Sequence, residues 1–548
     1  MLSLSKLMLL YSLLMIRNTA LTSFFYVALA IAAITTLAAC NQSSSRGRLV
    51  SRNNLITKTN AYSNLFIDSL TLENFISKEV TSDSLALQLR NFYNARNYGF
   101  AWFDENGPTV QAEGFWNAHK KALKQTGDSS IYDMQLHLQM DSLFSGDSTY
   151  SMSKDTLALT ELRMTKHFFD YVQYAYGAKV DPKSVQWNVP RRKLKPVAML
   201  DSLLSGSIKQ PLFNKAFYAL RNEVFRYRTI QQKGGWAVVA GKGKWKAGDN
   251  NSSITSIKMR LQSSDDYDKT DTSSLFTKAL EDAIKKVEVG YGLKADGKTD
   301  DALIKQLNIP VGERIKQMLI NLERMKWMPE APSNYLLANI PEYRLHVVEN
   351  GKQVMAMNIV VGRAANRSVI FSDELKFVVF SPYWNIPRNI VRNEIVPGMN
   401  HSKNYLARKN MEVTGYSGGL PVVRQKPGGA NALGKVKFIF PNSYNIYFHD
   451  TPSKSLFNRQ ERAFSHGCIR LQQPFDLAVY LLRNQPEWTN EKIKAAMNSS
   501  KEKWVTLDKV VPVFITYFSS WVDADGLLHF ADDIYGHDKR LAVQLFEK

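Results

Sequence analysis

Apolar residues in the first half of the chain recur at helical spacing. Five of them are separated by steps of three, seven, three and four residues and therefore share one helical face: Leu159, Leu162, Phe169, Val172 and Tyr176. Gly177 and Pro182 then mark the end of that helix. We predict a helical scaffold domain over residues 61–250. Its histidines, His119, His137 and His167, are far apart in sequence and are expected to be unrelated surface or core residues.

A shorter helical pattern follows over residues 251–310. A stripe at Leu280, Ile284 and Val287 precedes the turn Gly292-Leu-Lys-Ala-Asp-Gly297 and a closing apolar pair. This arrangement resembles a peptidoglycan-binding module, which implies a compact three-helix unit. Val287-Glu288 stands where that family has Phe-Gln. The unit is therefore expected either to bind peptidoglycan or to serve as a spacer.

The period of the pattern changes to two after about residue 335. Alternating apolar residues predict strands at 336–339, 343–348, 353–361, 375–380, 436–440, 446–448, 511–517 and 527–530. A helix is predicted at 475–482, with Pro474 at its first position. Residues 311–548 therefore form a β-rich domain with few helices, and the whole chain is a multidomain α+β protein.

One polar segment interrupts this domain. Residues 388–429 are rich in Arg, Lys and Asn and lie between two predicted core strands. A loop of this length inside a compact domain is usually functional, so we predict a capping insert that closes over a site. The alternative is a solvated excursion of the surface.

Composition limits the classes of protein that remain. At 548 residues the chain has room for about three or four domains. Its formal net charge of +20 suits an anionic neighbourhood, but the basic residues are spread along the chain, which disfavours nucleic acid as a partner. With only Cys40 and Cys468, the chain has neither a disulfide framework nor a cysteine-rich metal cluster.

The N-terminus has the pattern of a secretory signal. Residues 1–39 contain Lys6 and Arg17, no acidic residue and an apolar run that ends at Leu37-Ala-Ala-Cys40. This ending resembles the lipobox of bacterial lipoproteins, which implies lipidation of Cys40, a tether over 40–60, and a periplasmic protein anchored to the inner or outer membrane. The alternative is a single membrane-spanning anchor, for which the run is slightly short.

Cys468 is the candidate nucleophile. It lies in Ser465-His466-Gly467-Cys468-Ile469-Arg470, and His449 ends a predicted strand. Thiol attack needs a base or cation nearby, which His449 and Arg470 supply, and Gly467 permits a tight turn. A small buried cysteine, or a disulfide to Cys40, is the alternative. A metal site would need more ligands than His449, His466 and Cys468.

The spacing of His449 from the Ser-His-Gly-Cys-x-Arg segment resembles the signature of L,D-transpeptidases, which cross-link bacterial peptidoglycan. Three further motifs strengthen the resemblance: Tyr383-Trp384-Asn385-Ile386-Pro387, Asn431-Ala-Leu-Gly434 and Asp532-Asp-Ile-Tyr-Gly-His-Asp538. The domain order is similar to that of the large Gram-negative, periplasmic branch of the family.

The resemblance implies a role for each residue. Cys468 attacks the carbonyl of the third residue of a tetrapeptide stem and releases D-Ala; His449 is the base; and a second stem's amine completes a 3→3 cross-link. Gly467 and Cys468 provide oxyanion N–H groups, Ser465 and His466 orient the turn and His449, and Arg470 holds the stem or the geometry of the site. Tyr447 and Trp384 are pocket walls or core residues, and Asn431 contributes to substrate binding. No metal or organic cofactor is required.

Two other functions remain open at this point. The same site could run as an L,D-carboxypeptidase that uses water as acceptor, or the chain could be a non-catalytic wall-binding lipoprotein. The sequence decides neither the oligomeric state nor the identity of the third stem residue.

Overall fold

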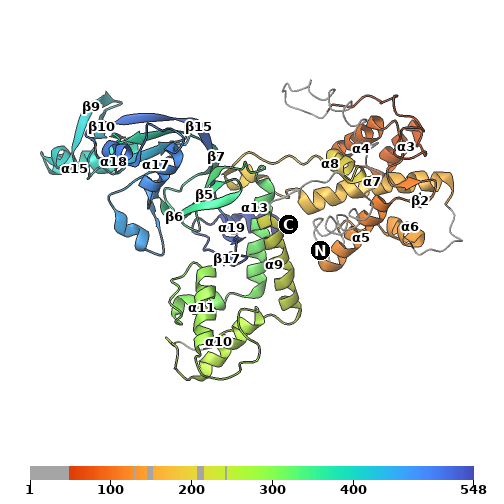
Figure 1. Cartoon of the computed structure of the whole chain (residues 1–548), viewed down its shortest axis with the longest axis horizontal. Helices are drawn as coiled ribbons and strands as arrows, with labels where there is room; N and C mark the ends of the chain where they lie inside the picture. Colours follow the sequence, from red (N-terminus) through yellow and green to blue (C-terminus); the bar gives the residue numbers. More distant parts are fainter. Residues whose placement is uncertain (1–47, 127–129, 145–151, 207–214, 241–242, 548) are drawn as a thin grey trace. The chain divides into compact units, whose positions relative to one another are not determined.

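The computed structural model describes residues 48–126, 130–144, 152–206, 215–240 and 243–547 (Figure 1). The predicted signal, Cys40 and the first part of the tether lie outside the described residues. The chain is a multidomain α+β protein with two compact units. One unit contains the described residues up to Ala178 and those from Lys193 to Asn214; the other contains Lys179–Arg192 and the chain from Lys215 onward.

The first unit is helical. Its helices are α3 (Ser69–Glu79), α4 (Asp83–Ala95), α5 (Val110–Thr126), α6 (Met134–Phe144), α7 (Lys154–Tyr176) and α8 (Pro196–Leu204), and its short strands are β1 (Phe103–Asp104) and β2 (Gly107–Pro108). The helix expected at 159–176 is α7. The hydroxyl of Ser153 caps it by accepting a hydrogen bond from the Thr156 amide, and Leu162, Phe169 and Val172 are buried.

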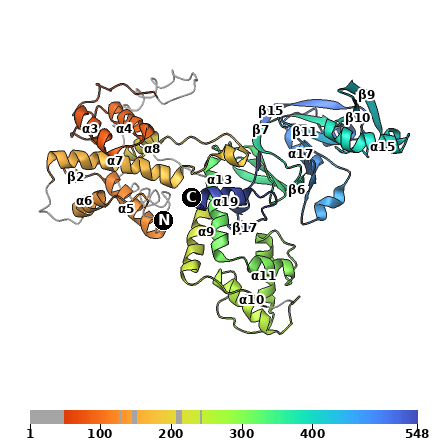
Figure 2. The ribbon, with the colours of Figure 1, turned by 180° about the vertical axis from the view of Figure 1, so that it is seen from behind.

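The stretch 61–250, which the sequence analysis assigns to one scaffold domain, is divided between the two units. Helix α9 (Lys215–Gln232) lies beside α13 (Val311–Trp327) in the second unit (Figures 1 and 2). A short 3₁₀ turn (Pro182–Val185) and β3 (Trp187–Asn188) also belong there, and β3 pairs with β7 (Ile370–Phe380). Helical periodicity identifies a buried face, but it does not identify the partner that buries it.

Residues 252–307 contain α10 (Ser252–Ser263), α11 (Lys278–Gly290) and α12 (Asp301–Leu307). Their apolar stripes meet in one core that includes Ile257, Leu280, Ile284 and Leu303. Glu288, at the departure from the family pattern, is buried and accepts a hydrogen bond from the Gly297 amide at 2.8 Å. Glu288 thus holds the turn before α12.

Strands from most of the C-terminal part form one large sheet. They are β4 (Tyr335–Asn339), β5 (Arg344–Glu349), β6 (Lys352–Gly362), β7, β11 (Val436–Ile439), β12 (Phe448–His449), β13 (Ala463–Ser465), β14 (Ile469–Leu471) and β15 (Lys503–Thr516). The order is β11-β12-β14-β6-β5-β4-β15-β7-β3, with β13 also on β6. Because β11 pairs with both β12 and β7, the sheet closes on itself.

The remaining elements surround this sheet. They are α17 (Pro474–Leu482), α18 (Asn490–Met497), α19 (His537–Phe546), a 3₁₀ turn (Lys454–Asn458) and the hairpin of β16 (Ser520–Val522) and β17 (Leu528–Phe530). Each strand expected from the alternating pattern lies on or beside an observed strand. Helices α18 and α19 were not expected.

The expectation of a polar loop at 388–429 was wrong, because the insert is folded. It contains α14 (Arg388–Ile390), a π-helical turn (Val391–Ile395), α15 (Val396–His401), α16 (Tyr405–Arg408), β9 (Met411–Ser417) and β10 (Leu420–Gln425). Strand β10 pairs with β9 and with β8 (Trp384–Asn385). A separate apolar core comprises Ile386, Ile390, Val391, Ile395 and Val423. These few apolar residues are diluted among charged ones, which hid the core from sequence analysis.

Candidate active site

His449 ends β12, and Cys468 immediately precedes β14, the parallel strand beside β12. Phe448 is opposite Ile469 and His449 is opposite Arg470, while the Ile469 amide donates to the Tyr447 carbonyl at 3.2 Å. Opposed residues of neighbouring strands point to the same face of a sheet, and successive residues alternate. The side chains of Tyr447, His449, Cys468 and Arg470 therefore share one face. Their neighbours Phe448, Ile469 and Leu471 are fully buried in the core behind it.

The hydrogen bonding of His449 fixes its tautomer. Its Nδ1 lies 2.5 Å from the backbone carbonyl oxygen of Asp450, and a carbonyl only accepts, so Nδ1 carries the proton. The Nε2 atom is then the basic nitrogen. Only 3% of the side chain is exposed. Burial, assisted by the charge of Arg470, lowers the pKa of His449 to about 3. The imidazole is thus neutral at ordinary pH.

The Cys468 thiol is protonated in the resting protein. Burial raises the pKa of the thiol, while hydrogen bonds from Tyr447 and the charge of Arg470 oppose this rise. The thiol contacts the Asn445 carbonyl at 3.6 Å. The two side chains on this face, Cys468 and His449, are therefore both neutral.

Arg470 supplies the positive charge of this face. The buried Nε atom of its guanidinium has no hydrogen-bond partner among the described residues. Burial lowers the pKa of Arg470, and a negative charge on Cys468 would raise it. A guanidinium with an unused donor beside the thiol suits a carboxylate or a developing negative charge.

The turn that carries Cys468 is braced internally. The Ser465 hydroxyl donates to the Cys468 carbonyl oxygen at 2.5 Å, so Ser465 does orient this turn. Gly467 has a φ of +120°, a conformation that side-chain-bearing residues rarely adopt. His466 instead faces the insert: its Nε2 lies 3.4 Å from a carboxylate oxygen of Glu394. This contact joins the Cys468 turn to the insert, and the role of His466 in orienting His449 stays a prediction.

Asn431 supports the loop. Its side chain is 1% exposed, and its amide nitrogen donates to the carbonyl oxygens of Pro382 and Lys426 at 3.0 and 2.9 Å. Its oxygen accepts from the Leu433 amide at 2.8 Å. The hydrogen-bonding groups of Asn431 are thus used within the chain, which favours a structural role over the predicted substrate contact.

Trp384 lies just before the insert and packs against it. It is half-buried on β8 and packs against the apolar core of the insert. The sequence allowed Trp384 to be either a pocket wall or a core residue, and this packing favours the core residue. Tyr447, by contrast, lies on the same sheet face as the thiol, with its ring centroid 5.8 Å from that of His449.

The expectation of unrelated histidines in the first unit was wrong. His119, His137 and His167 come from three helices and are buried together, with Nε2 of His119 and His167 3.1 Å apart. Burial lowers the pKa of His119 to about 4 and that of His167 to about 3. In the part of the chain that the structure describes, no group of three or more His, Cys, Asp or Glu residues could hold a metal ion.

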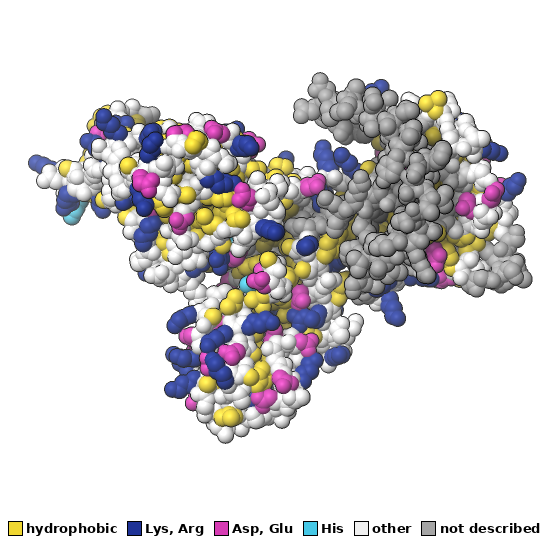
Figure 3. Space-filling model, in the orientation of Figure 1, with side chains coloured by type: hydrophobic (Ala, Val, Ile, Leu, Met, Phe, Trp, Pro, Cys, Tyr) yellow, Lys and Arg dark blue, Asp and Glu magenta, His cyan; other side chains and the backbone are white. Residues whose placement is uncertain are grey.

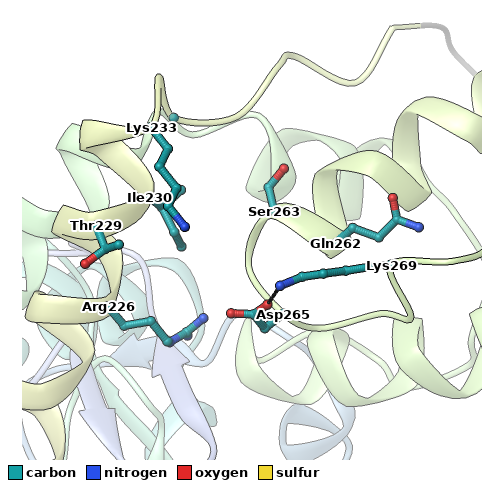
Figure 4. Close-up of a pocket in the computed structure, with 9 residues that line it drawn as sticks. Arg226, Thr229, Ile230, Lys233, Gln262, Ser263, Asp265 and Lys269 are labelled. Carbon is teal, nitrogen blue, oxygen red and sulfur yellow. Dashed lines mark ion pairs between the residues drawn. The ribbon is translucent and has the colours of Figure 1, made fainter.

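A cavity of about 370 Å³ lies between α9 and α10, apart from the residues around Cys468 (Figure 4). Of the charged residues that line it, Lys269 pairs with Asp265 at 2.5 Å, and Arg226 pairs with Glu223 of its own helix at 2.6 Å; Lys233 also lines the cavity. Figure 3 shows basic and acidic side chains intermingled over the three-helix segment on the face in view.

Comparison with known protein families identifies the domain that contains Cys468. Residues 333–495 match the model of the L,D-transpeptidase catalytic domain, and residues 87–233 match that of a scaffold domain. This chain contains an L,D-transpeptidase catalytic domain. The matched range includes Trp384, Asn431, Tyr447, His449 and the whole turn from Ser465 to Arg470.

Among individual proteins, the L,D-transpeptidase domain has a curated relative in Haemophilus influenzae, which is named provisionally as an L,D-transpeptidase. The two are 29% identical over 241 residues, which are 41% of this chain and 49% of the relative. The chain thus spans about half the length of this relative.

Solved structures with some likeness include L,D-transpeptidase 1 of Mycobacterium tuberculosis and an L,D-transpeptidase of Stackebrandtia nassauensis. Both are 16% identical to this chain. The first match covers 34% of this chain and 61% of that protein, with a TM-score of 0.16; the second covers 51% and 96%, with a TM-score of 0.21. At such TM-scores the overlays establish neither fold nor activity.

Sequence reasoning missed Ser368 and Tyr535. Ser368 donates to the carbonyl oxygen of Gly467 at 2.7 Å, and the Tyr535 hydroxyl contacts both Gly362 and the Ser368 amide. Tyr535 lies inside the closing motif Asp532–Asp538, which was noticed only as part of a resemblance. Ser368 gave no local signal, because its partner is 99 residues away.

Proposed function

We propose that this chain is a peptidoglycan L,D-transpeptidase in which Cys468 is the nucleophile and His449 the general base. The observation that carries the proposal is the coincidence of an L,D-transpeptidase domain match with three groups on one sheet face. They are a thiol, a neutral imidazole and a guanidinium whose Nε has no hydrogen-bond partner among the described residues. The substrate is the tetrapeptide stem of peptidoglycan, as donor and as acceptor.

The acylation step follows from the protonation states. The Cys468 sulfur forms a bond to the carbonyl carbon of the third stem residue while the thiol proton passes to Nε2 of His449. The resulting oxyanion collapses, the C–N bond to D-Ala breaks, and the imidazolium returns the proton to the leaving amine. A thioester to Cys468 and free D-Ala are the products of this half-reaction.

Transfer reverses the same proton path. The side-chain amine of a second stem attacks the thioester carbon, and His449 removes the amine proton. The C–S bond breaks, the sulfur recovers a proton, and the new amide is a 3→3 cross-link. Arg470 stabilises negative charge at the face or holds a stem carboxylate. The folded insert, which contacts the catalytic turn through Glu394 and His466, limits the access of water to the thioester.

The location proposed for this enzyme is the periplasm, with a lipid anchor on Cys40. Its support is the Leu-Ala-Ala-Cys pattern and the apolar run before it. Among the described residues, no helix is both long and apolar enough to cross a membrane. Replacement of Cys40 by Ser should move the protein from the membrane fraction to the soluble periplasmic fraction, and retention in the membrane would contradict lipidation.

The test of the function is product analysis. Purified protein is incubated with disaccharide-tetrapeptide, and the products are identified by mass spectrometry. Tetrapeptide-tripeptide dimers with loss of D-Ala support transpeptidation. Tripeptide without dimer would overturn it in favour of an L,D-carboxypeptidase, and unchanged substrate would favour a non-catalytic wall-binding protein. The Cys468→Ala variant is the control for contaminating activity.

A further inference from the structure

A buried serine outside the catalytic turn holds the backbone of that turn. Ser368 follows β6 and is 1% exposed. Its Oγ accepts a hydrogen bond from the Gly362 amide at 3.0 Å and donates to the Gly467 carbonyl oxygen at 2.7 Å. These donor and acceptor roles are fixed, since an amide only donates and a carbonyl only accepts.

This contact sets the direction of the Cys468 amide. In a trans peptide the C=O of one residue and the N–H of the next point in opposite directions, and the described chain has no cis peptide bonds. With the Gly467 carbonyl directed at Ser368, the Cys468 N–H points away from this buried hydroxyl. Among the described residues, nothing accepts a hydrogen bond from that N–H. An N–H of this kind beside a nucleophile is suited to an oxyanion.

A second layer fixes Ser368 in turn. The Tyr535 hydroxyl donates to the Gly362 carbonyl oxygen and accepts from the Ser368 amide at 3.3 Å. Burial raises the pKa of Tyr535 to about 12, so this hydroxyl keeps its proton. The Arg363 amide also donates to the Ser465 carbonyl oxygen at 2.9 Å. The loop after β6 is thus joined to the catalytic turn at both Ser465 and Gly467.

We propose that Ser368 is a positioning residue that orients the Cys468 N–H for the oxyanion of the acyl-transfer step. The inference rests on the proposed function. It goes further because it assigns orientation of the oxyanion donor to a hydroxyl that does not touch the substrate. Gly467 lacks a side chain and has a φ of +120°, so its peptide plane needs an external restraint of this kind.

Two reactions of the same sulfur separate this role from a general effect on folding. A carbapenem is attacked at its β-lactam carbonyl: the C–S bond forms, the ring C–N bond opens, and the transition state carries an oxyanion. Iodoacetamide is attacked at a saturated carbon: the C–S bond forms, iodide leaves, and no oxyanion appears. The second-order rate constant of each reaction at Cys468 is measured by intact-protein mass spectrometry on the full chain.

In Ser368→Ala, we expect carbapenem acylation to slow by about tenfold to a hundredfold. This is a smaller rate loss than the one caused by removing an oxyanion donor altogether, because the Cys468 N–H is still present. Alkylation by iodoacetamide should change less than about twofold, because it does not use that donor. Ser368→Thr, which retains a hydroxyl, should recover most of the acylation rate. The matched control is Ser381→Ala, since Ser381 is a buried serine that donates to the Ala496 carbonyl at 2.9 Å; both rates should match wild type.

Equal acylation rates in Ser368→Ala and wild type would overturn the inference, as would parallel losses in both reactions. If Ser368→Ala does not fold, Tyr535→Phe is used instead, because it removes the hydroxyl that contacts the Ser368 amide. The inference then requires that Tyr535→Phe slows carbapenem acylation but not alkylation by iodoacetamide. A wild-type protein that alkylates but never acylates would contradict the proposed function instead, so the two failures are distinguishable.

Discussion

Replacement of Gly434 by Ala should disturb the strand that carries His449. Gly434 has a φ of +63°, and a Cβ placed there would lie 2.5 Å from the Cβ of Asp450 and would overlap its carboxylate. Asp450 cannot move away freely. Its side chain is 7% exposed, and its carboxylate accepts from the Lys435 amide at 2.8 Å and pairs with Lys454 at 2.6 Å.

The magnitude has two parts. An alanine in the left-handed region costs roughly 1–2 kcal/mol, and overpacking against a fixed group adds about 1–3 kcal/mol, so we expect a loss of about 2–5 kcal/mol in the free energy of unfolding. The Asp450 carbonyl oxygen holds Nδ1 of His449 at 2.5 Å. A displaced Asp450 therefore misplaces the base, and acylation should slow by at least about tenfold.

Urea unfolding monitored by tryptophan fluorescence measures the stability, and carbapenem acylation measures the site. The matched control is Gly429→Ala: Gly429 is in the same loop, a Cβ there meets nothing within 4 Å, and its φ lies outside the left-handed region. Gly429→Ala should resemble wild type in both measurements. The reasoning is refuted if Gly434→Ala is no less stable than Gly429→Ala, or if it unfolds more easily yet acylates at the wild-type rate.

Three further predictions concern His449, Asn431 and Glu394. Because burial lowers the pKa of His449 to about 3, the neutral base persists far below the usual pKa of histidine, and the acylation rate should not fall between about pH 8 and pH 5; an acidic limb centred near the ordinary value of about 6.5 would contradict this. Asn431→Ala leaves buried groups without partners and should lower the free energy of unfolding by about 2–4 kcal/mol, whereas an unchanged stability with a raised substrate KM would restore a binding role. Glu394→Gln weakens a half-exposed contact with His466, so stability should change by less than about 1 kcal/mol while amide hydrogen exchange in residues 391–401 accelerates; unchanged exchange would show that the contact does not hold the insert.

Local sequence patterns predicted the helices and strands better than they predicted which of them pack against one another. The alternating residues of 353–361 and the capped periodic stripe of α7 needed only neighbours in sequence, and both elements formed where expected. The packing of α9 on α13 depends on residues about 90 positions apart, which no window of the sequence contains. The folded structure of the insert was not predicted for a related reason. Its core uses a few apolar side chains that come from β8, the π-helical turn and β10.

The candidate site shows the same division. Cys468, His449 and Arg470 are candidates because their chemistry is readable from residue type and spacing, and the register of β12 and β14 places their side chains on one face. The role of Asn431 was harder to predict, because a polar residue in a motif looks the same whether it faces a ligand or spans a loop. The three buried histidines of the first unit meet through tertiary packing of α5, α6 and α7, which sequence separation conceals.

The most direct test of the central claim is intact-protein mass spectrometry of the acyl-enzyme, followed by peptide mapping. Wild-type protein incubated with a tetrapeptide stem or a carbapenem should gain one adduct, located on Cys468. Cys468→Ala should gain none, and His449→Gln should acylate much more slowly although its cysteine is intact. An adduct that persists in Cys468→Ala, or a wild-type rate in His449→Gln, would contradict the account of a thiol activated by a neutral imidazole.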